Sequence, residues 1–196
     1  MSQQPRRSIV KGAAWAAPAV LATATIPAYA ASMPALDGWV LNILGSCSRD
    51  WWSGASSTTY TINGQGNYPD RGLWVSNAPA SAQIGVTKVT QYISETASAP
   101  AGGPLIFQTG GTSHQWSILA YDATAPVKAG YRAYTTTFNG TWRYDTAKKL
   151  WFPSTLPYFT TTVGKCITTL QVITARFVTI NGKIYSFERP GTLKPA

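Results

Sequence analysis

Residues 177–187, FVTINGKIYSF, predict a β-hairpin and with it the class of the fold. The Asn-Gly pair favours a type I′ turn, because both central residues of that turn need positive φ angles, and strand-forming residues flank it. A two-residue turn sets Ile180 opposite Lys183 and Val178 opposite Tyr185. One face of the hairpin is then largely apolar and the other largely polar, as in an antiparallel sheet that covers a core on one side.

Two further Asn-Gly pairs lie in the segments INGQ (62–65) and FNGT (138–141). In YTTTFNGTWRYD (134–145) a two-residue turn would set Thr137 opposite Trp142, giving a second hairpin. The pair at 63–64 is a weaker signal, because Pro69 would damage a strand that followed the turn closely.

Composition and turn spacing also favour strands. Charged residues make up only 12% of the chain and aromatic residues another 12%, and no segment after the first thirty residues sustains a helical period. DTAKK (145–149) predicts one more hairpin turn. The remaining strand candidates are Trp39–Leu44, Leu73–Ser76, Ile84–Ser94, Trp116–Tyr121, Leu150–Phe152 and Ile167–Ala175. About eight to ten short strands with frequent turns predict an all-β, antiparallel fold, either a two-sheet sandwich or a barrel.

The segment APVKAGYRAYTTTF (125–138) is similar to a late strand of immunoglobulin-like domains in secreted bacterial proteins. This resemblance implies an immunoglobulin-like two-sheet sandwich. The Cys…Trp…Cys spacing of antibody domains is not clearly met, so the resemblance extends to the sandwich in general.

The N-terminal thirty residues have the composition of a secretory signal peptide. Basic residues come first, the apolar run Ala13–Ile26 has 14 residues, and the small-x-small triplet 28–30 predicts cleavage between Ala30 and Ala31. The run is shorter than the roughly 20 residues that a membrane-spanning helix needs. An uncleaved interfacial anchor, with residues 1–30 helical, is the alternative.

RRSIVKG, with Arg6, Arg7 and Lys11, resembles the bacterial twin-arginine export signal, although Ile9 stands where that family prefers phenylalanine. A general-secretory signal that contains Arg-Arg is the alternative. The leader as a whole looks like those of small secreted actinobacterial proteins. If the twin-arginine resemblance holds, the protein crosses the membrane already folded.

Removal of residues 1–30 leaves one domain, residues 31–196, which is large enough for a core of its own. It carries thirteen Lys and Arg against seven Asp and Glu, a net charge of +6. The charges are scattered, which for an exported protein favours an anionic wall polymer or lipid headgroups over nucleic acid. The alternative is that they serve solubility alone. No second apolar run of 18 residues follows, so no membrane span is predicted after cleavage.

Cys47 and Cys166 are the two cysteines of the chain. In an exported protein such a pair predicts one disulfide, and a pair of buried free thiols is the alternative. Two cysteines with the single histidine, His114, do not provide a structural zinc site, and we expect neither a metal nor another cofactor.

Motifs of catalysis are missing from the sequence, which has no G-x-S-x-G, H-E-x-x-H or phosphate-binding loop. Ser113 precedes His114, but nothing nearby completes a triad. Two carboxylates would suffice for a glycosidase, although ion pairing and solvation explain the acids more simply. We therefore expect no enzyme, with a small hydrolase as the least favoured alternative. The seven acids are Asp37, Asp50, Asp70, Glu95, Asp122, Asp145 and Glu188.

SCSRDWWSG (46–54) holds the candidate binding residues Arg49, Trp51 and Trp52 beside Cys47. On a strand, adjacent tryptophans point to opposite faces, so one would be buried and one exposed. An exposed Trp near a cation is a platform for a sugar ring or a protein partner. The sequence favours another interpretation over this platform, in which both tryptophans cover the end of the core next to the disulfide. Trp74 and Trp151 are weaker candidates of the same kind.

Together these patterns predict a secreted, non-catalytic β-sandwich protein that associates with the cell envelope as a binding or structural module. Its expected partners are an anionic wall polymer, a polysaccharide or a surface protein. The alternative is a carbohydrate-binding module that uses exposed tryptophans.

Overall fold

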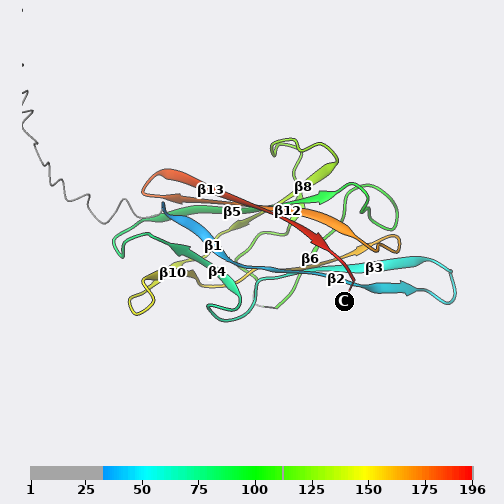
Figure 1. Ribbon diagram of the computed structural model, residues 1–196, viewed down its shortest axis with the longest axis horizontal. Coiled ribbons are helices and arrows are strands. Elements are labelled where there is room, and N and C mark those ends of the chain that lie inside the picture. Colours follow the sequence, from blue (N-terminus) through cyan, green and yellow to red (C-terminus); the bar gives the residue numbers. More distant parts are fainter. Residues whose placement is uncertain (1–32, 112, 196) are drawn as a thin grey trace, which may run out of the picture. The chain divides into compact units, whose positions relative to one another are not determined.

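The computed structural model describes residues 33–111 and 113–195 (Figure 1). This part of the chain is all β, and it contains no helix. The predicted signal peptide, with Arg6, Arg7 and Lys11 and the cleavage site between Ala30 and Ala31, lies outside the described residues. From Met33 onward the chain forms one compact unit.

Within the described residues the strands form three sheets, in which neighbouring strands pair antiparallel. The first has the order β1-β4-β10-β9, with β1 (Ala35–Trp39), β4 (Gly72–Ser76), β10 (Leu150–Pro153) and β9 (Trp142–Asp145). The second is β2-β3-β11-β6, with β2 (Leu41–Arg49), β3 (Ser56–Asn63), β11 (Tyr158–Val163) and β6 (Gln108–Thr109). The third is β13-β12-β5-β8-β7, with β13 (Lys183–Leu193), β12 (Leu170–Ile180), β5 (Ile84–Ser94), β8 (Tyr131–Phe138) and β7 (Ala120–Tyr121).

The two four-stranded sheets are joined by short connections, so that the chain passes three times from a strand of one sheet to a strand of the other. Only residue 40 separates β1 from β2, whereas residues 64–71 separate β3 from β4 and residues 154–157 separate β10 from β11. β1 and β4 approach so closely next to these connections that a Cβ at Gly38 would collide with the carbonyl oxygen of Gly72. Both glycines have positive φ angles, which other residues rarely adopt. The all-β prediction is confirmed, but the structure has three sheets rather than two.

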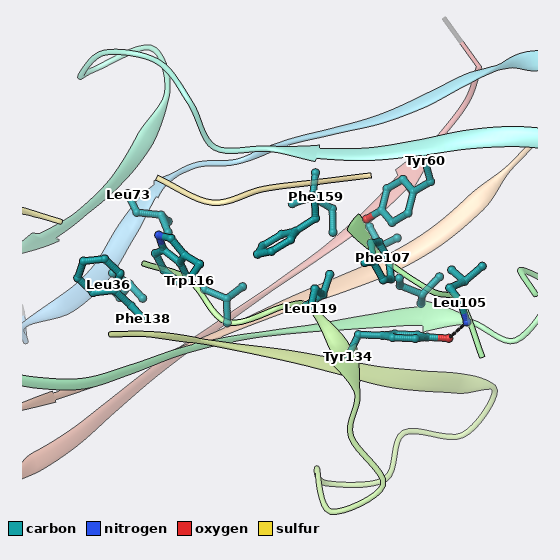
Figure 2. Packing of buried hydrophobic residues seen from close by; sticks show 14 of the residues in the cluster. Leu36, Tyr60, Leu73, Leu105, Phe107, Trp116, Leu119, Tyr134, Phe138 and Phe159 are labelled. Carbon is teal, nitrogen blue, oxygen red and sulfur yellow. Dashed lines mark hydrogen bonds between the residues drawn. The ribbon is translucent and has the colours of Figure 1, made fainter. Parts of the chain in front are cut away.

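The hydrophobic core lies between the five-stranded sheet and the two four-stranded sheets, as in a β-sandwich (Figure 2). Alternate residues of the strands enter it, as the period of two requires. Leu36 and Phe159 come from the four-stranded sheets and Tyr134 and Phe138 from β8. Trp116 enters from the segment that was predicted as the strand Trp116–Tyr121. That prediction is largely wrong, since only an isolated bridge at Trp116 and the short β7 form there.

The hairpin predicted from residues 177–187 is confirmed. The structure pairs Ile180 with Lys183 and Val178 with Tyr185. Asn181 and Gly182 have φ angles of 50° and 79°, as a type I′ turn demands. The turn at DTAKK is also present, between β9 and β10.

The hairpin predicted around Asn139 and Gly140 is wrong. Neither residue has a positive φ angle, so no type I′ turn forms. Instead the chain crosses from β8 in the five-stranded sheet to β9 in a four-stranded sheet, and β9 pairs with β10. The backbone N–H of Asn139 donates to Gln115 O at 2.8 Å. Tertiary contacts therefore override the local preference of the Asn-Gly pair.

Candidate functional site

Trp51 and Trp52 lie in the turn that joins β2 to β3, here called the hairpin tip (residues 50–55). The backbone N–H of Asp50 donates to Ala55 O at 2.8 Å, and that of Gly54 donates to Asp50 O at 2.9 Å. Gly54 has a φ angle of 67°, which explains why glycine occupies this position. The hairpin tip is thus a closed turn with defined backbone hydrogen bonds.

The side chain of Asp50 fixes the hairpin tip from within. Its Oδ1 accepts hydrogen bonds from the backbone N–H groups of Trp52 (3.0 Å) and Ser53 (2.6 Å) and from the Ser53 hydroxyl (2.8 Å). This is the arrangement by which Asp stabilises turns. The backbone N–H of Ser53, followed by its hydroxyl, lowers the pKa of Asp50 below the ordinary value, because these hydrogen bonds favour the carboxylate.

Both tryptophans of the hairpin tip point into solvent, with exposed fractions of 89% for Trp51 and 92% for Trp52. The interpretation that they cover the end of the core is therefore wrong, and so is the assignment of one to each face of a strand. The physical reason is that the turn begins at Asp50, so neither residue has strand geometry. Two large apolar rings remain outside the core.

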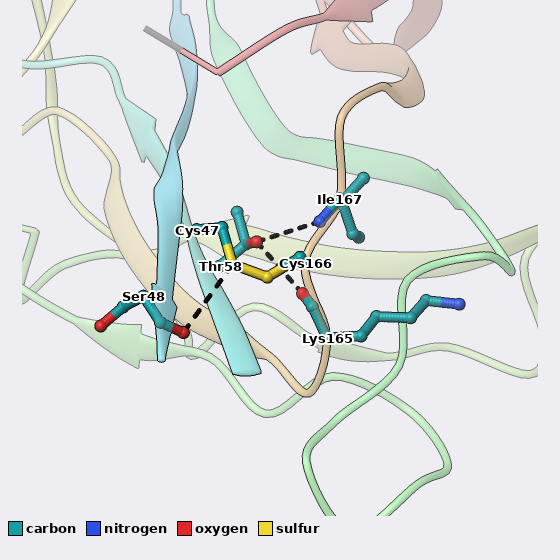
Figure 3. The surroundings of a disulfide bond; sticks show 6 residues. All are labelled: Cys47, Ser48, Thr58, Lys165, Cys166 and Ile167. Carbon is teal, nitrogen blue, oxygen red and sulfur yellow. Dashed lines mark hydrogen bonds between the residues drawn. A yellow bond between two sulfur atoms is a disulfide. The ribbon is translucent and has the colours of Figure 1, made fainter. Parts of the chain in front are cut away.

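The predicted disulfide between Cys47 of β2 and Cys166 holds the hairpin close to its tip (Figure 3). The two Cα atoms lie 5.1 Å apart, within the usual range for a disulfide. The buried hydroxyl of Thr58 donates to Lys165 O at 3.1 Å and accepts from the Ile167 N–H at 3.2 Å (Figure 3). The hairpin is thereby fastened to the segment that connects β11 with β12.

Positive charge accompanies the two rings. Arg49 is exposed at the end of β2, and a Cβ added to Gly54 would lie 3.8 Å from its Nη2. Lys165 is exposed beside the disulfide. Arg49, the last residue of β2, thus adjoins Trp51 and Trp52 of the hairpin tip, and their role as a binding site stays a prediction.

A groove of about 260 Å³ lies on the outer face of the same sheet, and no motif in the sequence predicted it. Thr59 of β3 and Thr160 and Thr162 of β11 line it, together with Gln108 of β6 and the apolar Ile106. The two strands are paired so that Thr162 lies opposite Thr59. The threonine-rich runs SSTTYT (56–61) and FTTTV (159–163) could have indicated this groove, because strand alternation places every second threonine on the outer face.

The other candidates have structural roles. The indole N–H of Trp151 donates to Pro79 O at 3.1 Å, and Trp74 stacks edge-on with Tyr68. Ser113 is buried, and its hydroxyl donates to Gly110 O at 2.5 Å, whereas His114 is exposed. These residues do not form a nucleophile–base pair.

Five of the seven acids accept hydrogen bonds or pair with lysines, among them Asp37, which accepts from Gly38 N at 2.7 Å. Asp50 closes the hairpin tip, Asp122 accepts from the hydroxyl of Thr124, and the other two pair with lysines: Lys148–Asp145 at 2.7 Å and Lys128–Glu188 at 2.9 Å. Within residues 33–111 and 113–195, no three His, Cys, Asp or Glu side chains gather as a metal site. The same residues contain no helix that is long and apolar enough to cross a membrane.

Replacement of Asp50 separates the geometry of the hairpin tip from the stability of the fold. In Asp50→Ala we expect faster hydrogen exchange at the Ser53 amide with an unchanged unfolding midpoint, because Asp50 is exposed and its partners lie within the turn. Asp50→Asn keeps an acceptor and should retain most of the protection. Because the folded pKa is lowered, the wild-type turn is held at neutral pH and loosens only as the pH falls through that depressed value. Equal exchange rates in all three proteins would contradict this role.

No protein-family model, curated protein or solved structure matches this chain, so its function is proposed from the geometry of the hairpin tip and the groove.

Proposed function

We propose that this protein is an exported, non-catalytic binding module that attaches to a polysaccharide of the cell envelope through the hairpin tip. The observation that carries the proposal is the exposure of both Trp51 and Trp52 on a braced turn. Single exposed apolar side chains are common, but adjacent exposed aromatic rings form a patch of the kind that marks a binding surface. Flat aromatic rings also stack on the apolar faces of sugars. Asp50 and the disulfide support this use, because a preorganised turn loses little entropy on binding.

The threonine-lined groove supports a polysaccharide more than a bilayer. Hydroxyl and amide groups such as those of Thr59, Thr162 and Gln108 match the hydrogen-bonding groups of sugars. A lipid-facing surface would instead continue the apolar character of the two tryptophans. The groove lies on the sheet that ends in the hairpin tip, so one extended glycan chain is expected to contact both.

The leader, the disulfide and the net charge of the domain are consistent with a role outside the cell. The twin-arginine-like leader would deliver the domain outside the cell, where the Cys47–Cys166 disulfide is stable. The scattered positive charge of the domain would favour a wall that carries anionic polymers. We also propose that the two interrupted sheets act as one layer of an immunoglobulin-like sandwich.

Co-sedimentation with isolated actinobacterial cell wall tests the function. We expect the purified full chain to sediment with the wall, and Trp51→Ala or Trp52→Ala to weaken binding by about 30-fold, because a central aromatic contact contributes roughly 2 kcal/mol. Val127→Ala is the matched control, since it removes another exposed apolar side chain on a distant loop. Tryptophan fluorescence on addition of soluble wall polysaccharide should change in the wild type and in the control.

Two results would contradict the proposal. Equal sedimentation of the wild type and both tryptophan variants would show that the hairpin tip is not the contact surface. Binding to anionic lipid vesicles with none to the wall would assign the exposed tryptophans to a bilayer interface instead.

A further inference from the structure

A second feature lies far from the hairpin tip in the fold, between the start of β2 and the β12–β13 hairpin. A crevice of about 410 Å³ opens there. This volume lies within the usual range of small-ligand sites. Its walls are apolar at Val40, Val172 and Leu193 and polar at Thr174 and Arg176.

Arg176 is the unusual residue of this crevice, because it points between the sheets and is only 3% exposed. Its Nη1 donates to Gly38 O at 2.9 Å, but its buried Nε has no hydrogen-bond partner in the structure. A buried guanidinium is costly unless an anion accompanies it and accepts its hydrogen bonds. The backbone contact to Gly38 satisfies only part of this requirement.

The described residues supply no carboxylate in an ion pair with Arg176. Burial lowers the pKa of the guanidinium; Asp37 opposes that effect and Arg189 adds to it. Asp37 accepts a hydrogen bond from Gly38 N at 2.7 Å instead. Arg189, opposite Thr174 on β13, also lines the crevice, so two guanidinium groups converge on one space.

We propose that this crevice binds a small amphiphilic anion, a carboxylate or phosphate monoester that carries a short apolar chain. The anionic group contacts Arg176 and Arg189, and the chain lies against Val40 and Leu193. The Nε and Nη2 atoms of an arginine form a fork that matches two oxygens of such an anion. Thr174 lines the same wall, but its hydroxyl already donates its proton to Gln91 at 2.9 Å, so it has no further proton to donate to the anion. The inference is independent of the polysaccharide contact at the hairpin tip.

Titration calorimetry of the full chain with octanoate and octyl phosphate tests the site. We expect both to bind, inorganic phosphate to bind more weakly because it leaves the apolar wall uncovered, and neutral octyl glucoside not to bind. Arg189→Gln should weaken binding roughly tenfold, the effect of losing one charge-assisted contact. Lys88→Gln is the matched control, because it removes the same charge from an exposed position of β5.

Gly191→Leu gives a variant that blocks the crevice without removing a charge. A Cβ at Gly191 would lie 3.6 Å from Cγ2 of Val172, an ordinary contact, so a larger side chain can enter the crevice there. We expect this variant to fold and to lose octanoate binding.

The NMR signal of the Arg176 Nε–H gives a direct readout and is identified by its loss in Arg176→Lys. It should shift on addition of octanoate to the wild type and not to Gly191→Leu. An unchanged signal, or equal octanoate affinity of the wild type and Gly191→Leu, would overturn the proposal and leave Arg176 with its structural contact to Gly38.

Discussion

Replacement of Cys47 and Cys166 by serine is expected to lower the free energy of unfolding by about 4 kcal/mol, because the disulfide closes a loop of 119 residues. Closing a loop of this length lowers the conformational entropy of the unfolded chain and so raises its free energy. Both cysteines are exposed, so serine leaves no buried cavity, and the loss reports the cross-link itself. Urea denaturation of the full chain, followed by circular dichroism, measures the effect.

Reduction of the wild-type protein provides the control for the disulfide prediction. The reduced protein and the double serine variant should unfold at the same urea concentration, and reductant should not change the variant. A loss below about 1 kcal/mol would contradict the prediction, since even a short closed loop contributes more.

Replacement of Trp116 by alanine is expected to cost about 3–5 kcal/mol, the range for removal of a buried aromatic side chain. Trp116 is 3% exposed and packs against Phe138 with ring centroids 5.0 Å apart (Figure 2). Its indole N–H donates to Thr155 O at 3.0 Å, and this buried carbonyl loses that donor in the variant. The unfolding free energy from urea denaturation measures the loss.

Trp52→Ala is the matched control, because it makes the same chemical change at an exposed position. Its free energy of unfolding should stay within about 0.5 kcal/mol of the wild type, as for surface substitutions in general. A similar loss in both variants would show that Trp52 packs in the core and would also remove the basis of the proposed glycan contact.

Strand locations follow from the sequence more reliably than strand partners do. The turn at Asn181-Gly182 and its register were predicted correctly, because both strands are local and the turn needs nothing beyond its own residues. The same reasoning failed at Asn139-Gly140, where Gln115 and β10 compete for the chain. Such partners lie far away in sequence, and a local pattern does not contain them.

In the candidate site, too, the sequence predicted local features but not those that depend on distant residues. The composition of residues 46–54 named Arg49, Trp51 and Trp52 as binding candidates, which stays a prediction, whereas the pairing of Cys47 with Cys166 followed from their number and is present in the structure. The exposure of both tryptophans did not follow, because burial depends on whether the turn begins before or after them. The convergence of Arg176 with Arg189 was also hidden, since it requires the register of β12 against β13.

By itself the sequence determined the β class, the register of one hairpin and the cysteine pair, all of which rest on local turn chemistry or on residue counts. The tertiary structure decided which strands share a sheet, that the described residues form three sheets, and which tryptophans face solvent. The physical reason is that sheet partners are chosen by burial of apolar surface across the whole domain, to which residues far apart in the chain contribute together.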